Sequence, residues 1–174
     1  MYNFLYNTIK PEDKGIIGLL EVILDNTDIK ILNILRKNAR ANASEIAEMI
    51  KLSVSAVIER IKKLEASGVI KGYTVLLDSS AVGKDVMAMM SVSIEHPKFN
   101  DAFEAAVIQN PSITECHYIA GDFDYLLKVI TDNTKTLEKV LNEIKSLQGV
   151  SKTKTSIVFS SPKNEVTVAL KSKK

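Results

Sequence analysis

The residues best suited to chemistry lie along one helical stretch, VSAVIERIKKLEASG, at positions 54–68. At about 100° per residue, its small and charged side chains fall on one side and its aliphatic side chains on the other. That polar side is small at the start and charged further on, which suits a helix end that enters the major groove of DNA. The predicted DNA-contact residues are Ser53, Ser55, Ala56, Glu59, Arg60, Lys62 and Lys63.

Within this set, Ser55, Ala56 and Glu59 are expected towards base edges, whereas the basic residues are expected mainly at phosphates. Between Lys51 and Lys71 there are five basic residues against two acidic ones, a modest electrostatic footprint. Judged from charge alone, an ordinary solvated helix face is equally compatible with this pattern.

A helix-turn-helix must position these residues. Asn42 followed by Glu45 predicts a capping box that starts one helix, and Ser53 predicts the N-cap of the next. Gly68 predicts the end of the second helix, and this helix is expected to bury Val54, Val57, Ile58, Ile61 and Leu64. Two helices joined by so short a turn are typical of a DNA-reading unit.

A third helix is expected upstream, where LDNTDIKILNILRKNAR carries apolar residues at helical spacing and Asp25 and Asn26 can cap the start. Downstream, VIKGYTVLL (69–77) is expected to form a strand, either a wing or the exit from the unit.

The C-terminal half repeats a strand–helix–strand pattern. Strands are expected at 86–95, 113–120, 123–131 and 150–160, and helices at 99–110 and 134–148. This order is typical of the split βαβ, ferredoxin-like arrangement with both helices on one face of an antiparallel sheet. EVTVAL (165–170) is expected to add a further strand.

The predicted fold class is therefore α+β, with an N-terminal three-helix helix-turn-helix domain followed by a ferredoxin-like βαββαβ domain. The expected divisions are an N-terminal extension (1–23), the helix-turn-helix domain (24–72), a strand and linker (73–85) and the ferredoxin-like domain (86–174). Six large aliphatic residues within 16–23 favour an additional helix in the extension.

The sheet face that carries no helices is of mixed character. Met87 and Met89 are apolar, whereas Lys128, Lys152 and Lys154 are charged. Partial coverage by another copy of the chain is one interpretation, and a one-sided sheet that faces water is the other.

Composition excludes several classes of function. One cysteine, Cys116, allows no intrachain disulfide, which favours a reducing, cytoplasmic setting, and this residue is expected to be a small buried hydrophobe. No apolar run reaches the roughly 18 residues that span a membrane. The sequence lacks a phosphate loop and a GxSxG motif, and His96 and His117 are far apart, so no catalytic residue, metal or cofactor is expected.

Three stretches, LDNTDIKIL, VIERIKKLEASGVIKGYT and above all ECHYIAGDFDYLLKV, resemble the Lrp/AsnC (feast/famine) transcriptional regulators. The resemblance runs from about Leu24 to Leu170. It implies an amino-acid-sensing protein that binds double-stranded DNA and forms dimers through its C-terminal sheets, often assembled into octamers. It also implies effector binding in clefts between dimers, near a glycine-containing turn.

The matching turn is Gly121-Asp122-Phe123-Asp124-Tyr125, from which the resemblance carries over Gly121 and Asp124. Glycine allows close backbone approach to a ligand, and a carboxylate can pair with an ammonium group. From the residues alone, an ordinary hairpin turn with a solvated Asp124 is the better interpretation. The predicted effector set is Tyr118, Gly121, Asp122, Asp124, Tyr125, Thr131, Asn133 and Thr134, the last also as a helix N-cap.

Two hypotheses follow. The first is a sequence-specific transcriptional regulator whose assembly or DNA affinity responds to a small amino acid. The second is an amino-acid-binding regulatory module that acts on a partner protein. The predicted helix-turn-helix favours the first.

Overall fold

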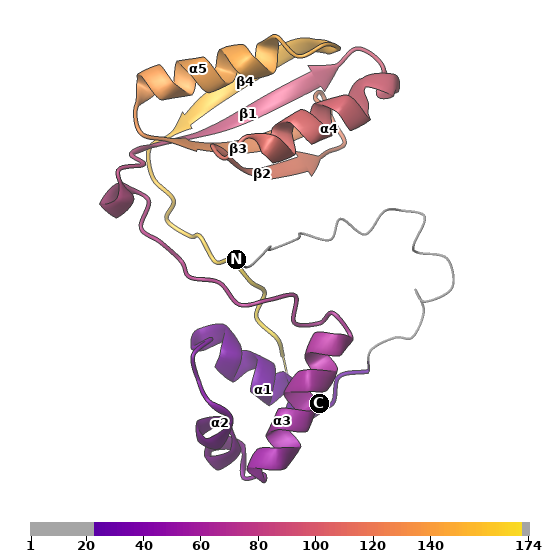
Figure 1. The fold of residues 1–174 in the computed structure, drawn as a ribbon, viewed down its shortest axis with the longest axis vertical. Coiled ribbons are helices and arrows are strands. Elements are labelled where there is room, and N and C mark those ends of the chain that lie inside the picture. Colours follow the sequence, from indigo (N-terminus) through magenta and orange to yellow (C-terminus); the bar gives the residue numbers. More distant parts are fainter. Residues whose placement is uncertain (1–22, 172–174) are drawn as a thin grey trace. The chain divides into compact units, whose positions relative to one another are not determined.

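The computed structural model describes residues 23–171 (Figure 1). The helix expected at 16–23 lies outside the described residues except for Ile23, which is exposed and belongs to no helix. The described chain divides into two compact units. The first contains residues 23–74 and 165–171, and the second contains residues 75–164.

Three helices form the first unit: α1 (Asn26–Lys37), α2 (Ala43–Ile50) and α3 (Val54–Ala66). Each contributes its apolar stripe to one small core, whose buried members are Ile31, Leu35, Ile46, Ala47, Val57 and Leu64. The core is small, so the capping of each helix matters to the stability of the unit.

The predicted caps are confirmed. The Asp25 carboxylate accepts from the Asp28 backbone N–H at 2.7 Å, and Asn42 accepts from the Glu45 N–H at 3.0 Å. Both are reciprocal capping boxes. Ser53 Oγ accepts from the third helical N–H of α3 at 3.2 Å. The sequence pattern therefore located the start of every helix in this unit.

Two expected strands are absent from the described chain. Residues 69–77 and 165–170 are extended or bent, and neither belongs to a sheet. Both segments have strand-like composition, but a strand is stabilised by the neighbour with which it shares hydrogen bonds, and neither has one here. Val75 is 78 % exposed and Leu77 70 % exposed as a result.

Residues 165–170, here called the C-terminal return segment, contact α1 instead of the sheet. Asn33 Nδ2 donates to the Leu170 carbonyl oxygen at 3.1 Å. Arg36 Nη1 lies 3.8 Å from Glu165 Oε2. The end of the described chain therefore belongs to the first unit, although its sequence follows the second.

The second unit is an antiparallel sheet in the order β2-β3-β1-β4, which confirms the ferredoxin-like arrangement (Figure 1). Its elements are β1 (Val86–Ile94), α4 (Asn100–Gln109), β2 (Ile113–Tyr118), β3 (Tyr125–Thr131), α5 (Thr134–Lys145) and β4 (Val150–Val158), with short 3₁₀ turns at Ser80–Val82 and Pro97–Phe99.

Both long helices of this unit cover the same face of the sheet. Phe103 of α4 and Ile144 of α5 share one core with Ala88, Met90 and Val92, which are fully buried on alternate positions of β1. The opposite face carries no helix, so it is here called the open face. No helix within residues 23–171 is long and apolar enough to cross a membrane.

The start of α5 differs from the expectation. Asn133, not Thr134, is the N-cap, because its side chain accepts from the backbone N–H groups of Lys135 at 2.9 Å and Thr136 at 3.0 Å. Asparagine reaches these groups from the position before the helix, whereas Thr134 is already the first helical residue.

Candidate functional site

The exposed side of α3 carries the predicted DNA-contact residues. Ser55, Glu59, Lys62 and Lys63 are exposed, and their spacing puts them along one side of the helix. Ala56 is half-buried at the margin of this surface. The result is a short polar face with two exposed lysines, which have no ion-pair partner within residues 23–171, towards the C-terminal end of the helix.

The opposite side of α3 is less buried than expected. Val57 and Leu64 are in the core and Ile61 is half-buried. Val54 and Ile58, which were also expected to be buried, are 42 % and 40 % exposed. The small three-helix core has too little surface to cover the whole apolar stripe, so its edge stays in contact with solvent.

Ser53 performs a structural role at the start of α3. Its hydroxyl oxygen accepts the helix-capping hydrogen bond and lies 3.1 Å from the hydroxyl of Ser55. Both hydroxyls therefore stand together at the N-terminal end of α3, where exposed N–H groups favour an anion such as a phosphate.

Arg60, unlike these two lysines, is held by an ion pair within the described chain. Its Nη1 donates to Asp25 Oδ2 and to Asp28 Oδ1, both at 2.7 Å. Arg60 was expected to contact a phosphate, but its guanidinium already binds two carboxylates at the start of α1. The sequence pattern did not predict this contact, because the partners are 35 and 32 residues away.

The glycine-containing turn lies between β2 and β3. Gly121 and Asp122 are exposed, and a Cβ built on Gly121 would meet nothing within 4 Å. The φ of Gly121 is +148°, a conformation that other residues rarely adopt. This turn therefore presents an open backbone surface beside an exposed carboxylate.

Asp124 is engaged within the chain. Its Oδ2 accepts from the Ile94 N–H at 2.7 Å, and its own N–H donates to the Val92 carbonyl at 3.0 Å. These bonds attach the turn to the end of β1. One oxygen of Asp124 is thus already used, whereas Asp122 has an exposed carboxylate at the tip of the turn.

The two tyrosines that flank the turn differ in their exposure to solvent. Tyr125 is 1 % exposed and donates to Glu104 Oε1 at 2.7 Å. Burial, then the nearby Glu104 carboxylate, raise the pKa of Tyr125. Tyr118 is 68 % exposed, with its ring centroid 5.1 Å from that of Tyr125. Tyr118 is the one that an approaching ligand could reach.

The remaining predicted effector residues lie elsewhere. Thr131 ends β3 and the turn precedes its start, so they are roughly 20 Å apart along the seven-residue strand. Thr131 is 1 % exposed and donates to the Asn133 carbonyl at 3.3 Å, and Asn133 caps α5. A single chain does not bring Thr131, Asn133 and Thr134 together with Gly121.

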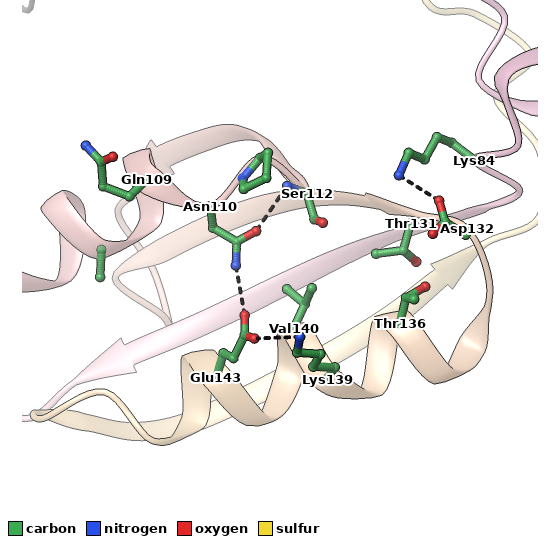
Figure 2. Close-up of a pocket in the computed structure, with 12 residues that line it drawn as sticks. Lys84, Gln109, Asn110, Ser112, Thr131, Asp132, Thr136, Lys139, Val140 and Glu143 are labelled. Carbon is green, nitrogen blue, oxygen red and sulfur yellow. Dashed lines mark hydrogen bonds and ion pairs between the residues drawn. The ribbon is translucent and has the colours of Figure 1, made fainter.

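A groove of about 480 Å³ opens between α4 and α5 on the helical side of the second unit (Figure 2). Its lining combines hydroxyl, amide and charged groups over an apolar floor: Lys84, Ala106, Gln109, Asn110, Pro111, Ser112, Thr131, Asp132, Thr136, Lys139, Val140 and Glu143. Of the predicted effector residues only Thr131 lines it. Sequence reasoning missed this groove, since its residues are dispersed and share no motif.

The charged groups of the groove pair with one another. Lys84 Nζ lies 2.6 Å from Asp132 Oδ1, and Glu143 accepts from Asn110 Nδ2 at 3.1 Å while Lys139 lies 4.0 Å away (Figure 2). A zwitterion that entered the groove would have to compete with these contacts.

The edge strand β2 carries polar groups on the open face. Glu115 accepts from Lys128 Nζ at 2.8 Å and lies 3.2 Å from His117 Nε2. The hydrogen bond from Lys128 is the main cause of a lowered pKa at Glu115, with His117 adding to it. Cys116, expected to be buried, is exposed because β2 is the edge strand and no helix or strand of the described residues lies beyond it. Within residues 23–171, no cluster of His, Cys, Asp and Glu could hold a metal.

The architecture therefore defines a class of protein: a helix-turn-helix unit linked to a ferredoxin-like unit with an exposed glycine-containing turn. Comparison with known families agrees. Residues 24–71 match the winged helix-turn-helix DNA-binding family, and residues 86–168 match the Lrp/AsnC ligand binding domain. The chain belongs to the Lrp/AsnC family, and it is a ligand-responsive DNA-binding transcriptional regulator, not an enzyme.

Individual relatives cover most of the chain. The HTH-type transcriptional regulator FL11 from Pyrococcus furiosus is 34 % identical over 79 % of this chain and 90 % of its own. The leucine-responsive regulatory protein of Escherichia coli is 33 % identical over 86 % and 93 %. A Neisseria meningitidis transcriptional regulator in complex with L-Met is similar in structure, with a TM-score of 0.80 and 32 % identity over 86 % of this chain and 97 % of that one.

Proposed function

We propose that this regulator binds double-stranded DNA in a sequence-specific way through α3, and that a small amino acid changes its assembly or its DNA affinity. One observation carries the proposal: a polar face on the second helix of a helix-turn-helix, in a chain whose other unit matches a ligand-binding domain. DNA as the proposed partner, together with the single cysteine, favours a cytoplasmic location.

In this proposal Ser55 and Glu59 face base edges, and Lys62 and Lys63 contact phosphates. Each phosphate contact releases counterions, so losing one contact lowers the slope of log affinity against log salt by about 0.9. Lys63→Ala is expected to show this decrease and to weaken binding to all sequences alike.

The test is a series of mobility shifts across salt concentrations. The probe is a duplex that the intact protein selects from random sequences, with a scrambled duplex for comparison. Lys145→Ala, which removes an exposed lysine from α5 in the other unit, is the matched control. An unchanged salt slope for Lys63→Ala would remove Lys63 from the interface, and no selected sequence at all would overturn DNA recognition.

We assign the effector to the turn between Tyr118 and Tyr125. The Gly121 backbone would meet the carboxylate of an amino acid, and the exposed Asp122 carboxylate would pair with its ammonium group. Asp124 would hold the turn in place, since its Oδ2 is bound to Ile94. The relative solved with L-Met supports the ligand class.

Calorimetry with each of the standard amino acids tests this assignment. Gly121→Trp and Asp122→Asn are both expected to abolish or strongly weaken the heat of binding, while Gly72→Ala leaves it unchanged. Binding that survives both changes would place the ligand elsewhere, and the groove of Figure 2 would then be the next site to examine.

We further propose that a second copy of the chain covers the open face and that such dimers assemble further, up to the octamers that the sequence resemblance implies. Met87, Met89, Leu126 and Ile130 lie on this face without being fully buried. A second copy would bury them around the paired charges of Glu115 and Lys128.

Met89→Asp is expected to lower the molar mass measured by light scattering, because it puts an unpaired charge into the proposed interface. Ile108→Asp is the matched control, since Ile108 is 65 % exposed on α4, on the helical side of the same unit. A wild-type monomer at micromolar concentration would contradict the proposed assembly.

A further inference from the structure

Arg60 joins α3 to the start of α1. A single guanidinium nitrogen, Nη1, lies 2.7 Å from both Asp25 Oδ2 and Asp28 Oδ1. Those two aspartates also form the reciprocal capping box of α1, with the Asp28 N–H at 2.7 Å from Asp25 and the Asp25 N–H at 3.2 Å from Asp28. The three side chains therefore make one connected network across two helices.

The network carries no net positive charge that would attract a phosphate. Two carboxylates and one guanidinium give a local net charge of −1, so a phosphate near Arg60 would be repelled. The Asp28 side chain is only 12 % exposed, and a carboxylate so little hydrated needs the cation beside it. The pKa of Asp25 is lowered first by the Asp28 backbone N–H and then by Arg60, which keeps Asp25 ionised at neutral pH.

The network also restricts the rotation of α3 about its own axis, which the apolar core does not fix. Val57 and Leu64 hold α3 against α1 and α2 by apolar contact, which is non-directional and allows a helix to rotate slightly about its axis. A charge-assisted hydrogen bond with two acceptors restricts that rotation. Arg60 follows Glu59 directly in α3, so fixing one fixes the direction of the other.

We propose that Arg60 is a positioning residue for DNA recognition: through Asp25 and Asp28 it sets the rotation of α3, so that Ser55 and Glu59 face the base edges, and it makes no phosphate contact itself. This inference rests on the proposed DNA recognition by α3. It assigns Arg60 a role in the specificity of binding, whereas Lys62 and Lys63 contribute to affinity for any sequence.

The experiment measures two quantities for the full chain: the ratio of affinities for the selected and the scrambled duplex, and the salt slope. The ratio does not depend on the folded fraction, because both affinities come from the same protein sample. Arg60→Met and Asp28→Asn are each expected to lower the ratio roughly tenfold, about the effect of one mismatched base pair. The salt slope should stay as in the wild type.

Asp28→Asn distinguishes the two roles by the sign of its effect. If Arg60 were a phosphate contact, removing the competing carboxylate would strengthen binding to both duplexes and steepen the salt slope. A positioning role predicts the opposite, a loss of preference for the selected duplex. Asp25→Asn, at a more exposed aspartate, should show the same loss to a smaller degree and remains usable if Asp28→Asn fails to fold.

Two controls separate this inference from the proposed function. Arg40→Met, which removes an exposed arginine outside the network, should leave the ratio unchanged. A wild-type protein without any sequence preference would overturn DNA recognition itself. If the wild type shows a preference, two results for Arg60→Met would overturn only the role of Arg60. These are an unchanged ratio of affinities and a salt slope lowered by about 0.9.

Discussion

Gly149 is the one described glycine that has no room for a side chain. Its φ is +89°, and an added Cβ would collide with the ring of Phe99. Gly149→Ala combines backbone strain with overpacking and should lower the free energy of unfolding by about 2–5 kcal/mol. Gly72→Ala has open space and no such φ, so it should change stability by less than about 0.5 kcal/mol. Chemical denaturation of both variants measures the difference, and equal stabilities would contradict it.

Cys116 is exposed, yet its thiol should react slowly. Desolvation, with the Glu104 carboxylate second, raises the pKa of Cys116 to about 11. At pH 8 only about one thiol in a thousand would then be ionised, compared with roughly a quarter for an ordinary cysteine. The alkylation rate by iodoacetamide should therefore keep rising beyond pH 9. Protein unfolded in urea is the control, and a rate that levels off near pH 9 in the folded chain would contradict the raised pKa.

Lys51, in the turn between α2 and α3, occupies a left-handed conformation with a φ of +58°. Such backbone costs an L-residue about 1–2 kcal/mol. Glycine avoids this cost, but part of the gain is offset because a glycine loses more conformational entropy on folding. Lys51→Gly should therefore raise the stability of the first unit by up to about 1 kcal/mol. Lys62→Gly removes the same side chain from a helix interior and should lower stability by about 1 kcal/mol. Similar losses in both variants would refute the strain at Lys51.

Short-range signals in the sequence predicted most elements. The caps at Asp25, Asn42 and Ser53 are local, since each side chain bonds to a backbone group three residues away. The strands expected at 69–77 and 165–170 did not form, because a strand requires a partner that its own residues do not specify.

The candidate site was predictable only in part, for the same reason. The exposed face of α3 follows from helical periodicity and the open turn from Gly121. The two carboxylates beside Arg60 come from the start of α1. The position of Arg60 within its own helix is the same whether it binds a phosphate or a carboxylate, so the helical pattern could not predict which of the two it contacts. The separation of Thr131 from Gly121, in contrast, follows from the strand expected at 123–131, because Thr131 ends that strand and Gly121 precedes it.

Two segments connect the two units, because the C-terminal return segment rejoins α1 after the sheet is complete. A chain that stops after Asn164 would lose the hydrogen bond from Asn33 to Leu170 and the ion pair between Arg36 and Glu165. One such hydrogen bond contributes about 1 kcal/mol and an exposed ion pair less, so the first unit should lose about 1–2 kcal/mol.

Hydrogen exchange of the α1 amides measures this loss, with the amides of β3 as the internal control. Asn33→Ala should reproduce most of it in the full chain and add little in the shortened one. Equal effects of Asn33→Ala in both chains would mean that the return segment does not hold α1.

The position of the return segment also decides what an optical probe would sense. A fluorophore attached at Lys171, directly after Leu170, would sit beside α1 and report on the helix-turn-helix, although the preceding strand belongs to the sheet. A Lys171→Cys variant could carry this label selectively, because Cys116 remains largely protonated at neutral pH. Fluorescence anisotropy at that site would then follow DNA binding, while the native sequence of α3 stays intact.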